Sequence, residues 1–110
     1  MTVLQLVDSL KLKIFSGSKG LSNEIKGGYV SDLLSDVMGN AQEGQVWITL
    51  QTHKNVMAIA SLKDLAAVIL VKGLQPNPDT AAQSEEENIP LLGATDQTFE
   101  MSGKLYNLLK

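Results

Sequence analysis

The segment QVWITLQTHKNVMAIASLKDLAAVILV, residues 45–71, contains the succession of strand, helix and strand that decides the fold. Along residues 45–51 the side chains alternate as in a strand, with Val46, Ile48 and Leu50 on one side and Trp47, Thr49 and Gln51 on the other. Thr52 can cap a helix whose apolar side is made of Val56, Ile59, Ala60 and Leu62. Residues 67–71 form a continuous apolar run, which is typical of a strand that is covered on both faces.

Downstream of this segment the sequence predicts helix, strand and helix again. Asn77-Pro78 follows a loop and begins a mostly polar helix, residues 78–87, in which only Ala81 and Ala82 are suited to face a sheet. Residues 89–92 read as a last strand, and the proline at its second position favours a sheet edge or the start of a strand. Asp96 can then cap a final helix, whose predicted apolar side consists of Phe99, Leu105, Tyr106 and Leu109.

Upstream, residues 1–10 predict an amphipathic helix that begins with a capping box formed by Thr2 and Gln5. A short strand is expected around residues 12–15 and a second one at residues 24–30, where paired Gly27-Gly28 indicates a bulge or a close approach of another chain segment. Ser31 or Asp32 can cap a short helix in which Leu33, Leu34, Val37 and Met38 share one face. The repeated alternation of strands and helices predicts an α/β domain with a mainly parallel sheet between helical layers.

Composition narrows the possible functions of this 110-residue chain, which we expect to form a single domain over residues 1–110. Nine lysines, no arginine and 12 acidic residues give a net charge of −3, so neither nucleic acid nor an anionic membrane surface is an expected partner. The absence of cysteine fits a reducing compartment. The longest apolar run, residues 65–71, is far shorter than the roughly twenty residues of a membrane span. We therefore expect a cytoplasmic protein.

No motif in the sequence predicts a catalytic, metal or cofactor site. Residues 39–46 have the glycine spacing of a phosphate-binding loop, but Gln45 and Val46 stand where the lysine and the hydroxyl are required. His53 is the only histidine, which excludes a histidine-rich zinc site. Asp32 and Asp36 could hold magnesium from one helical face, although carboxylates on a helix surface are common. The sequence therefore favours a protein that is not an enzyme.

Three segments together resemble the DRTGG domain family: residues 27–34 (GGYVSDLL), residues 46–49 (VWIT) and the ending IPLL, residues 89–92, followed by Thr98-Phe99. The similarity covers essentially the whole chain. It implies a three-layer α/β/α sandwich like the N-terminal domain of HPr kinase/phosphorylase. Thr52-His53 replaces the Asp-Arg pair of the family name, and Val71-Lys72-Gly73 replaces Thr-Gly-Gly, so that only Gly73 is kept.

The resemblance also implies a function. Members of the family occur beside CBS modules in regulated pyrophosphatases, and the single-domain version is similar to proteins encoded near iron-only hydrogenase subunits in anaerobic bacteria. The sequence is therefore interpreted as a non-enzymatic regulatory or interaction module, a homodimer, with a protein partner in an anaerobic metabolic or redox system. The alternative is a small-molecule sensor that binds an adenine nucleotide or another phosphate-bearing ligand weakly.

Two sets of residues are the candidate sites. Ligands of parallel α/β sheets gather outside the carboxyl ends of the strands, near a switch in strand order, and both altered family motifs fall there. We call this predicted site the rim, and its residues are Ser31, Asp32, Thr49, Gln51, Thr52, His53, Asn55, Lys72 and Gly73. The predicted dimer contacts are Gly27, Gly28, Tyr29 and Trp47. Trp47 can also be a residue of the core, and Gly27-Gly28 a simple bulge.

Overall fold

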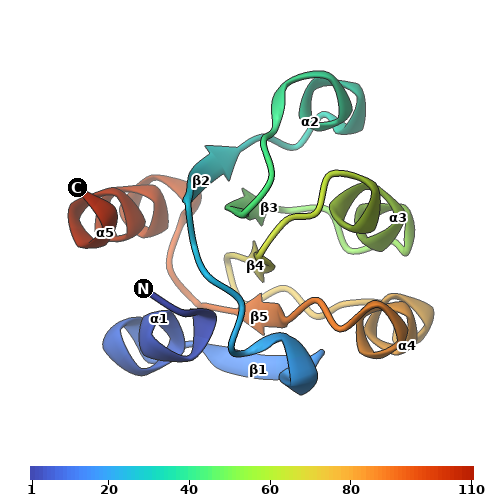
Figure 1. Cartoon of the computed structure of the whole chain (residues 1–110), viewed down its shortest axis with the longest axis horizontal. Coiled ribbons are helices and arrows are strands. Elements are labelled where there is room, and N and C mark those ends of the chain that lie inside the picture. Colours follow the sequence, from blue (N-terminus) through green and yellow to red (C-terminus); the bar gives the residue numbers. More distant parts are fainter.

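A five-stranded sheet in the order β1-β5-β4-β3-β2 forms the middle layer of the computed structural model, which describes residues 1–110 (Figure 1). Its strands are β1 (Lys13–Ser16), β2 (Gly27–Val30), β3 (Gln45–Thr49), β4 (Ala67–Leu70) and β5 (Leu91–Gly93). Strands β2, β3, β4 and β5 run parallel to one another, and β1 runs antiparallel to β5. The predicted, mainly parallel sheet is confirmed.

Helices cover both faces of this sheet and complete the predicted three-layer α/β/α sandwich (Figure 1). One face carries α2 (Leu34–Asn40), α3 (Asn55–Leu62) and α4 (Pro78–Glu87), and the other carries α1 (Val3–Leu10) and α5 (Thr98–Leu109). Because β3, β4 and β5 are each added on the same side of the preceding strand, crossovers of one hand place α2, α3 and α4 on one face. No helix of the chain combines the length and the apolar character that crossing a bilayer requires.

The alternation predicted along β3 divides the core into two parts. Val46 and Ile48 pack under α1 and α5, whereas Trp47 packs under α2 and α3 on the opposite face. Trp47 is completely buried, and its Nε1 donates a hydrogen bond to the carbonyl oxygen of Ser31 at 2.8 Å. The prediction of a dimer contact at Trp47 is therefore wrong, because the side chain has no surface to offer, and the alternative of a core residue is confirmed.

Other details of the prediction are confirmed or corrected by packing. The capping box of Thr2 and Gln5 is present, and Asn77 and Pro78 begin α4 as expected. Residues 27–30 pair with β3 without a bulge, and the close approach comes from Leu105 of α5, which lies over Gly28. The expected helix caps Thr52 and Asp96 are wrong, because Lys54 and Gln97 occupy those positions and neither forms a side-chain cap.

The helix faces differ most from expectation where helices carry few apolar residues. Thr80 and Ser84, not Ala81 and Ala82, are buried in α4 because their hydroxyls make hydrogen bonds: Thr80 Oγ1 to the Thr52 carbonyl at 2.7 Å, and Ser84 Oγ to the Ile89 carbonyl at 2.6 Å. Met101 and Leu105 are the buried residues of α5. Side chains expected on apolar helix faces but found exposed are Leu33, Met38, Leu62, Phe99 and Tyr106.

A substitution at Gly93 of β5 tests how tightly the Phe15 side chain of β1 packs against the neighbouring strand. The Phe15 ring occupies the space where a Cβ of residue 93 would lie, so Gly93→Ala must displace this ring of β1. We expect this substitution to lower the free energy of unfolding by about 1–3 kcal/mol, the usual cost of overpacking. The control is Gly39→Ala in α2, where an added Cβ meets no atom within 4 Å and helix propensity should raise stability by about 0.5–1 kcal/mol. Equal stability of the two variants in denaturant titrations would contradict a close contact between Phe15 and Gly93.

Candidate functional site

The residues of the predicted rim fall into two groups. Those of the first group, Asp32, Thr49 and Gln51, are joined by hydrogen bonds. Asp32, which follows β2, accepts hydrogen bonds at Oδ1 from Thr49 Oγ1 at 3.0 Å and from the Leu50 amide at 2.7 Å. Gln51 Nε2 donates to the Asp32 carbonyl oxygen at 2.8 Å. Asp32, Thr49 and Gln51 are therefore brought together as predicted, and their polar atoms tie the end of β2 to the end of β3.

The second group of rim residues is tied to α4 and to the segment after β5. The Thr52 carbonyl accepts from the Asn77 amide at 3.1 Å, and His53 Nδ1 lies 3.2 Å from Asn77 Nδ2. The amides of Lys72 and Gly73 donate to the carbonyls of Asp96 and Ala94, both at 2.8 Å. Of the nine predicted rim residues, only Gly73 lines a cavity. Ligand binding at Thr49–Asn55 stays a prediction.

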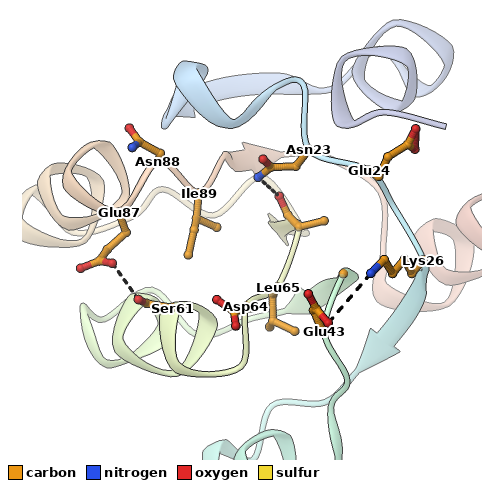
Figure 2. Close-up of a pocket in the computed structure, with 12 residues that line it drawn as sticks. Asn23, Glu24, Lys26, Glu43, Ser61, Asp64, Leu65, Glu87, Asn88 and Ile89 are labelled. Carbon is orange, nitrogen blue, oxygen red and sulfur yellow. Dashed lines mark hydrogen bonds and ion pairs between the residues drawn. The ribbon is translucent and has the colours of Figure 1, made fainter.

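A hollow of about 640 Å³ lies at the amino ends of the parallel strands, beside the starts of β3 and β4 and opposite the predicted rim (Figure 2). The sequence did not indicate it. Its polar lining is mainly acidic, with Glu24, Glu43, Asp64 and Glu87. Ser61 donates to Glu87 at 2.7 Å, and Lys26 lies 3.9 Å from Glu43. No three acidic or histidine side chains of the chain are placed to share a metal ion. The excess of carboxylates makes this hollow unfavourable for a phosphate or a carboxylate ligand.

The largest apolar concavity, about 740 Å³, lies between β2 and α5, and we call it the β2–α5 groove. Gly27, Gly28 and Val30 form its strand side, and Phe99, Gly103 and Tyr106 its helix side. Val30 is 47% exposed, Phe99 84% and Tyr106 71%. Large apolar side chains at this exposure, gathered around one groove, are typical of a surface that binds another molecule.

The four predicted dimer contacts do not share one surface. Gly27 and Gly28 line the β2–α5 groove, but Tyr29 points to the other face of the sheet, where its hydroxyl donates to Asp36 Oδ2 at 2.8 Å. Hydrogen bonds from the hydroxyls of Ser31 and Tyr29 lower the pKa of Asp36, and the bond to Asp36 raises the pKa of Tyr29. Sequence reasoning missed the exposure of Phe99 and Tyr106, although their spacing of seven residues around Gly103 places all three on one side of a helix.

Comparisons with known proteins support the fold. No model of a protein family matches the sequence. Among solved structures, the chain is similar to the CBS and DRTGG domains of the regulatory region of a Clostridium perfringens pyrophosphatase, complexed with its activator diadenosine tetraphosphate. The TM-score is 0.72 at 14% sequence identity, and the match covers 94% of this chain but only 45% of that one. The likeness shows a shared, DRTGG-like fold.

The hydrogen bonds of Asp32 predict a local effect of its removal. Asp32→Ala deprives the Thr49 hydroxyl and the Leu50 amide of their acceptor, and we expect a loss of about 1 kcal/mol in stability, typical of hydrogen bonds near the surface. Amide hydrogen exchange at Leu50 should accelerate, while exchange in β4 should stay unchanged. Asp8→Ala on α1 removes an exposed carboxylate that forms no hydrogen bond and serves as the control for charge. Unchanged exchange at Leu50 would show that Asp32 does not hold this segment.

Proposed function

We propose that this protein is a non-enzymatic regulatory module that acts as a symmetric homodimer, with the β2–α5 groove as its interface. The observation that supports this proposal is the presence of a ridge and a hollow on the same apolar surface. The ridge is formed by Phe99 and Tyr106, and the groove beside it has a volume of about 740 Å³. A two-fold axis through such a surface lets each copy insert its ridge into the groove of the other.

The form of α5 suits this arrangement. Phe99, Gly103 and Tyr106 follow one another along one side of the helix, and a Cβ at Gly103 would have open space around it. The glycine therefore leaves a notch between two exposed aromatic side chains. Removing apolar surface from water is worth about 25 cal/mol per Å², and aromatic residues are frequent anchors of interfaces. A standard interface buries about 800 Å² per partner. That is about one seventh of the 5617 Å² surface of this chain.

The two outer strands of the sheet differ in a way that favours β2 as the interface edge. β1 carries Lys13 and an irregular register between Ile14 and Ser16, two features that protect edge strands from pairing with another chain. β2 has the sequence GGYV, without charge and in regular register with β3. Its outer backbone groups are free of a neighbouring strand. Thus the less protected edge adjoins the apolar groove.

The regulatory part of the proposal is supported by the likeness to the regulatory region of the Clostridium perfringens pyrophosphatase. The resemblance of the sequence to single-domain DRTGG proteins further suggests a cytoplasmic role in an anaerobic metabolic or redox system, with a protein of that system as partner. The absence of catalysis is supported by the hydrogen bonds that the side chains of the rim already form within the chain. Its only histidine pairs with Asn77, and the Asp32 carboxylate holds Thr49 and Leu50.

A second candidate function is a sensor of adenine nucleotides. It is favoured by the activator bound to the similar pyrophosphatase region, diadenosine tetraphosphate. In this chain Thr52, His53 and Lys72 are the predicted contacts of the phosphates. Thermal stabilisation separates the two functions, since a ligand at 100 times its dissociation constant adds about 2.7 kcal/mol to the stability.

The homodimer predicts a molar mass of twice 11.8 kDa in light scattering at tens of micromolar protein. Phe99→Glu and Tyr106→Glu each place a charge in the proposed contact, and we expect each to weaken dimerisation by about tenfold or more. Neither residue contributes much to the core, so the variants should fold normally.

Leu62→Glu is the matched control for these variants. Leu62 on α3 is 67% exposed, but it lies on the opposite face of the sheet from α5. The control should dimerise like the unmodified protein. A mass of 11.8 kDa for the unmodified chain, or equal weakening by all three substitutions, would refute the proposed interface.

The absence of catalysis is tested separately with magnesium and either ATP or pyrophosphate. Phosphoryl transfer depends on positioned cations around the phosphates, and this chain has no arginine and no phosphate-binding loop. We expect no turnover above the buffer control across the gel-filtration peak. Turnover that follows the protein peak and persists after a second, different purification would refute the non-enzymatic proposal.

A further inference from the structure

Among the neighbouring parallel strands, only β4 and β5 are followed by connections that lead to opposite faces of the sheet. The connection after β4 leads to α4 on one face, whereas the connection after β5 leads to α5 on the other. In parallel α/β sheets, a crevice forms outside the carboxyl ends of two neighbouring strands whose connections leave in opposite directions. By this rule the ligand position of the fold is at the ends of β4 and β5, not at the end of β3.

A hollow of about 350 Å³ is present at this position. Its walls are the segment after β4, residues 73–75, the segment after β5, residues 94–96, and the start of β1. The first two segments are held together by the backbone hydrogen bonds from Lys72 to Asp96 and from Gly73 to Ala94, both 2.8 Å long. The positive φ angles of Lys72 (61°) and Gly73 (70°) turn the chain sharply there. Two of the walls are therefore joined to each other in the absence of a ligand, and such preorganisation reduces the entropic cost of binding.

The charge of the hollow is opposite to that of the whole protein. Lys11 and Lys13 line it, and neither forms an ion pair. The only acidic side chain of the lining, Asp96, is paired with Lys104 at 2.7 Å, and this contact lowers the pKa of Asp96. The lining thus contains two lysines without an ion-pair partner in a protein whose net charge is −3.

Part of the remaining lining is apolar, beside the polar side chains of Gln75 and Thr95. Leu10, Leu74 and Ala94 contribute aliphatic surface, and Phe15 contributes an aromatic ring. The Phe15 ring lies against Gly93, where a side chain of residue 93 would otherwise stand. The Lys13 ammonium lies 5.0 Å from the centre of the same ring, a cation–π distance, so the charge is positioned beside the apolar surface.

We propose that this hollow binds a small organic anion, in which a carboxylate or a phosphate is attached to a short apolar body. The lysines at its entrance bind the charged group, and Phe15 with its aliphatic neighbours contacts the body. β1 and β2 are the two outermost strands of the sheet, so the hollow and the β2–α5 groove lie at opposite edges. Binding at the hollow is therefore independent of the proposed homodimer, and either one can fail without the other.

The test is a titration of the ¹⁵N-labelled protein with four probes, followed by amide chemical shifts. Phenyl phosphate and benzoate present the two anionic groups on the same ring, benzyl alcohol presents the ring without charge, and inorganic phosphate the charge without a ring. We expect saturable shifts at residues 11–15, 73–75 and 93–96 with phenyl phosphate, benzoate or both, and weaker binding of the two other probes. Comparison of phenyl phosphate with benzoate distinguishes a phosphate ligand from a carboxylate ligand.

Variants decide whether the two lysines carry the binding. Lys11→Gln and Lys13→Gln should each lower the affinity for the better anion about fivefold, the effect of losing roughly 1 kcal/mol at an exposed ionic contact. Lys19→Gln is the control, since Lys19 is exposed and follows the opposite end of β1. Saturable shifts confined to residues 49–55, no saturation with either anion, or equal losses in all three variants would each overturn the proposal.

Discussion

The burial of β3 and β4 on both faces is the constraint on which the rest of the structure depends. All four residues of β4 are buried, as are residues 46–49 of β3. Two strands that are apolar on both sides are stable only when helices cover both sides. This requirement places α1 and α5 on one face and α2, α3 and α4 on the other. It also leaves the outer strands β1 and β2 with edges that no strand covers.

This constraint can be recognised in the sequence, because the alternation along residues 45–51 and the run at 67–71 are local patterns. Both sides of β3 were predicted correctly from these patterns, and the parallel sheet between helical layers from the alternation of strands and helices that continues downstream. Contacts between distant segments could not be predicted in the same way. The burial of Ser84 depends on its hydrogen bond from Ser16, 68 positions earlier, and the role of Gly28 depends on Leu105. Residue type alone predicts the opposite for a serine, since hydroxyl side chains are mostly exposed.

The candidate site shows the same limit. Sequence patterns correctly grouped Asp32, Thr49 and Gln51 at the carboxyl ends of neighbouring strands, because each residue follows a recognisable strand. They did not show that these residues form hydrogen bonds with one another, since that depends on side-chain geometry. Nor could they locate the change of faces at β5. Its position depends on strand order, and the pairing of β1 with β5 joins segments that are about eighty residues apart.

The distribution of polar groups explains why both proposed binding surfaces lie at the edges of the sheet. The central strands offer no reactive or charged side chain, and their only buried hydroxyl, that of Thr49, already donates to Asp32. A side chain in the middle of the sheet cannot be exposed to a ligand without uncovering the core. At β1 and β2, in contrast, only part of the surface is needed for packing. Lysines and the Phe15 ring are therefore accessible to a ligand at the β1 edge, and the aromatic ridge of α5 is accessible to a partner at the β2 edge. Surface residues at either edge can therefore be substituted, and the proposed binding altered, while the burial of β3 and β4 continues to stabilise the domain.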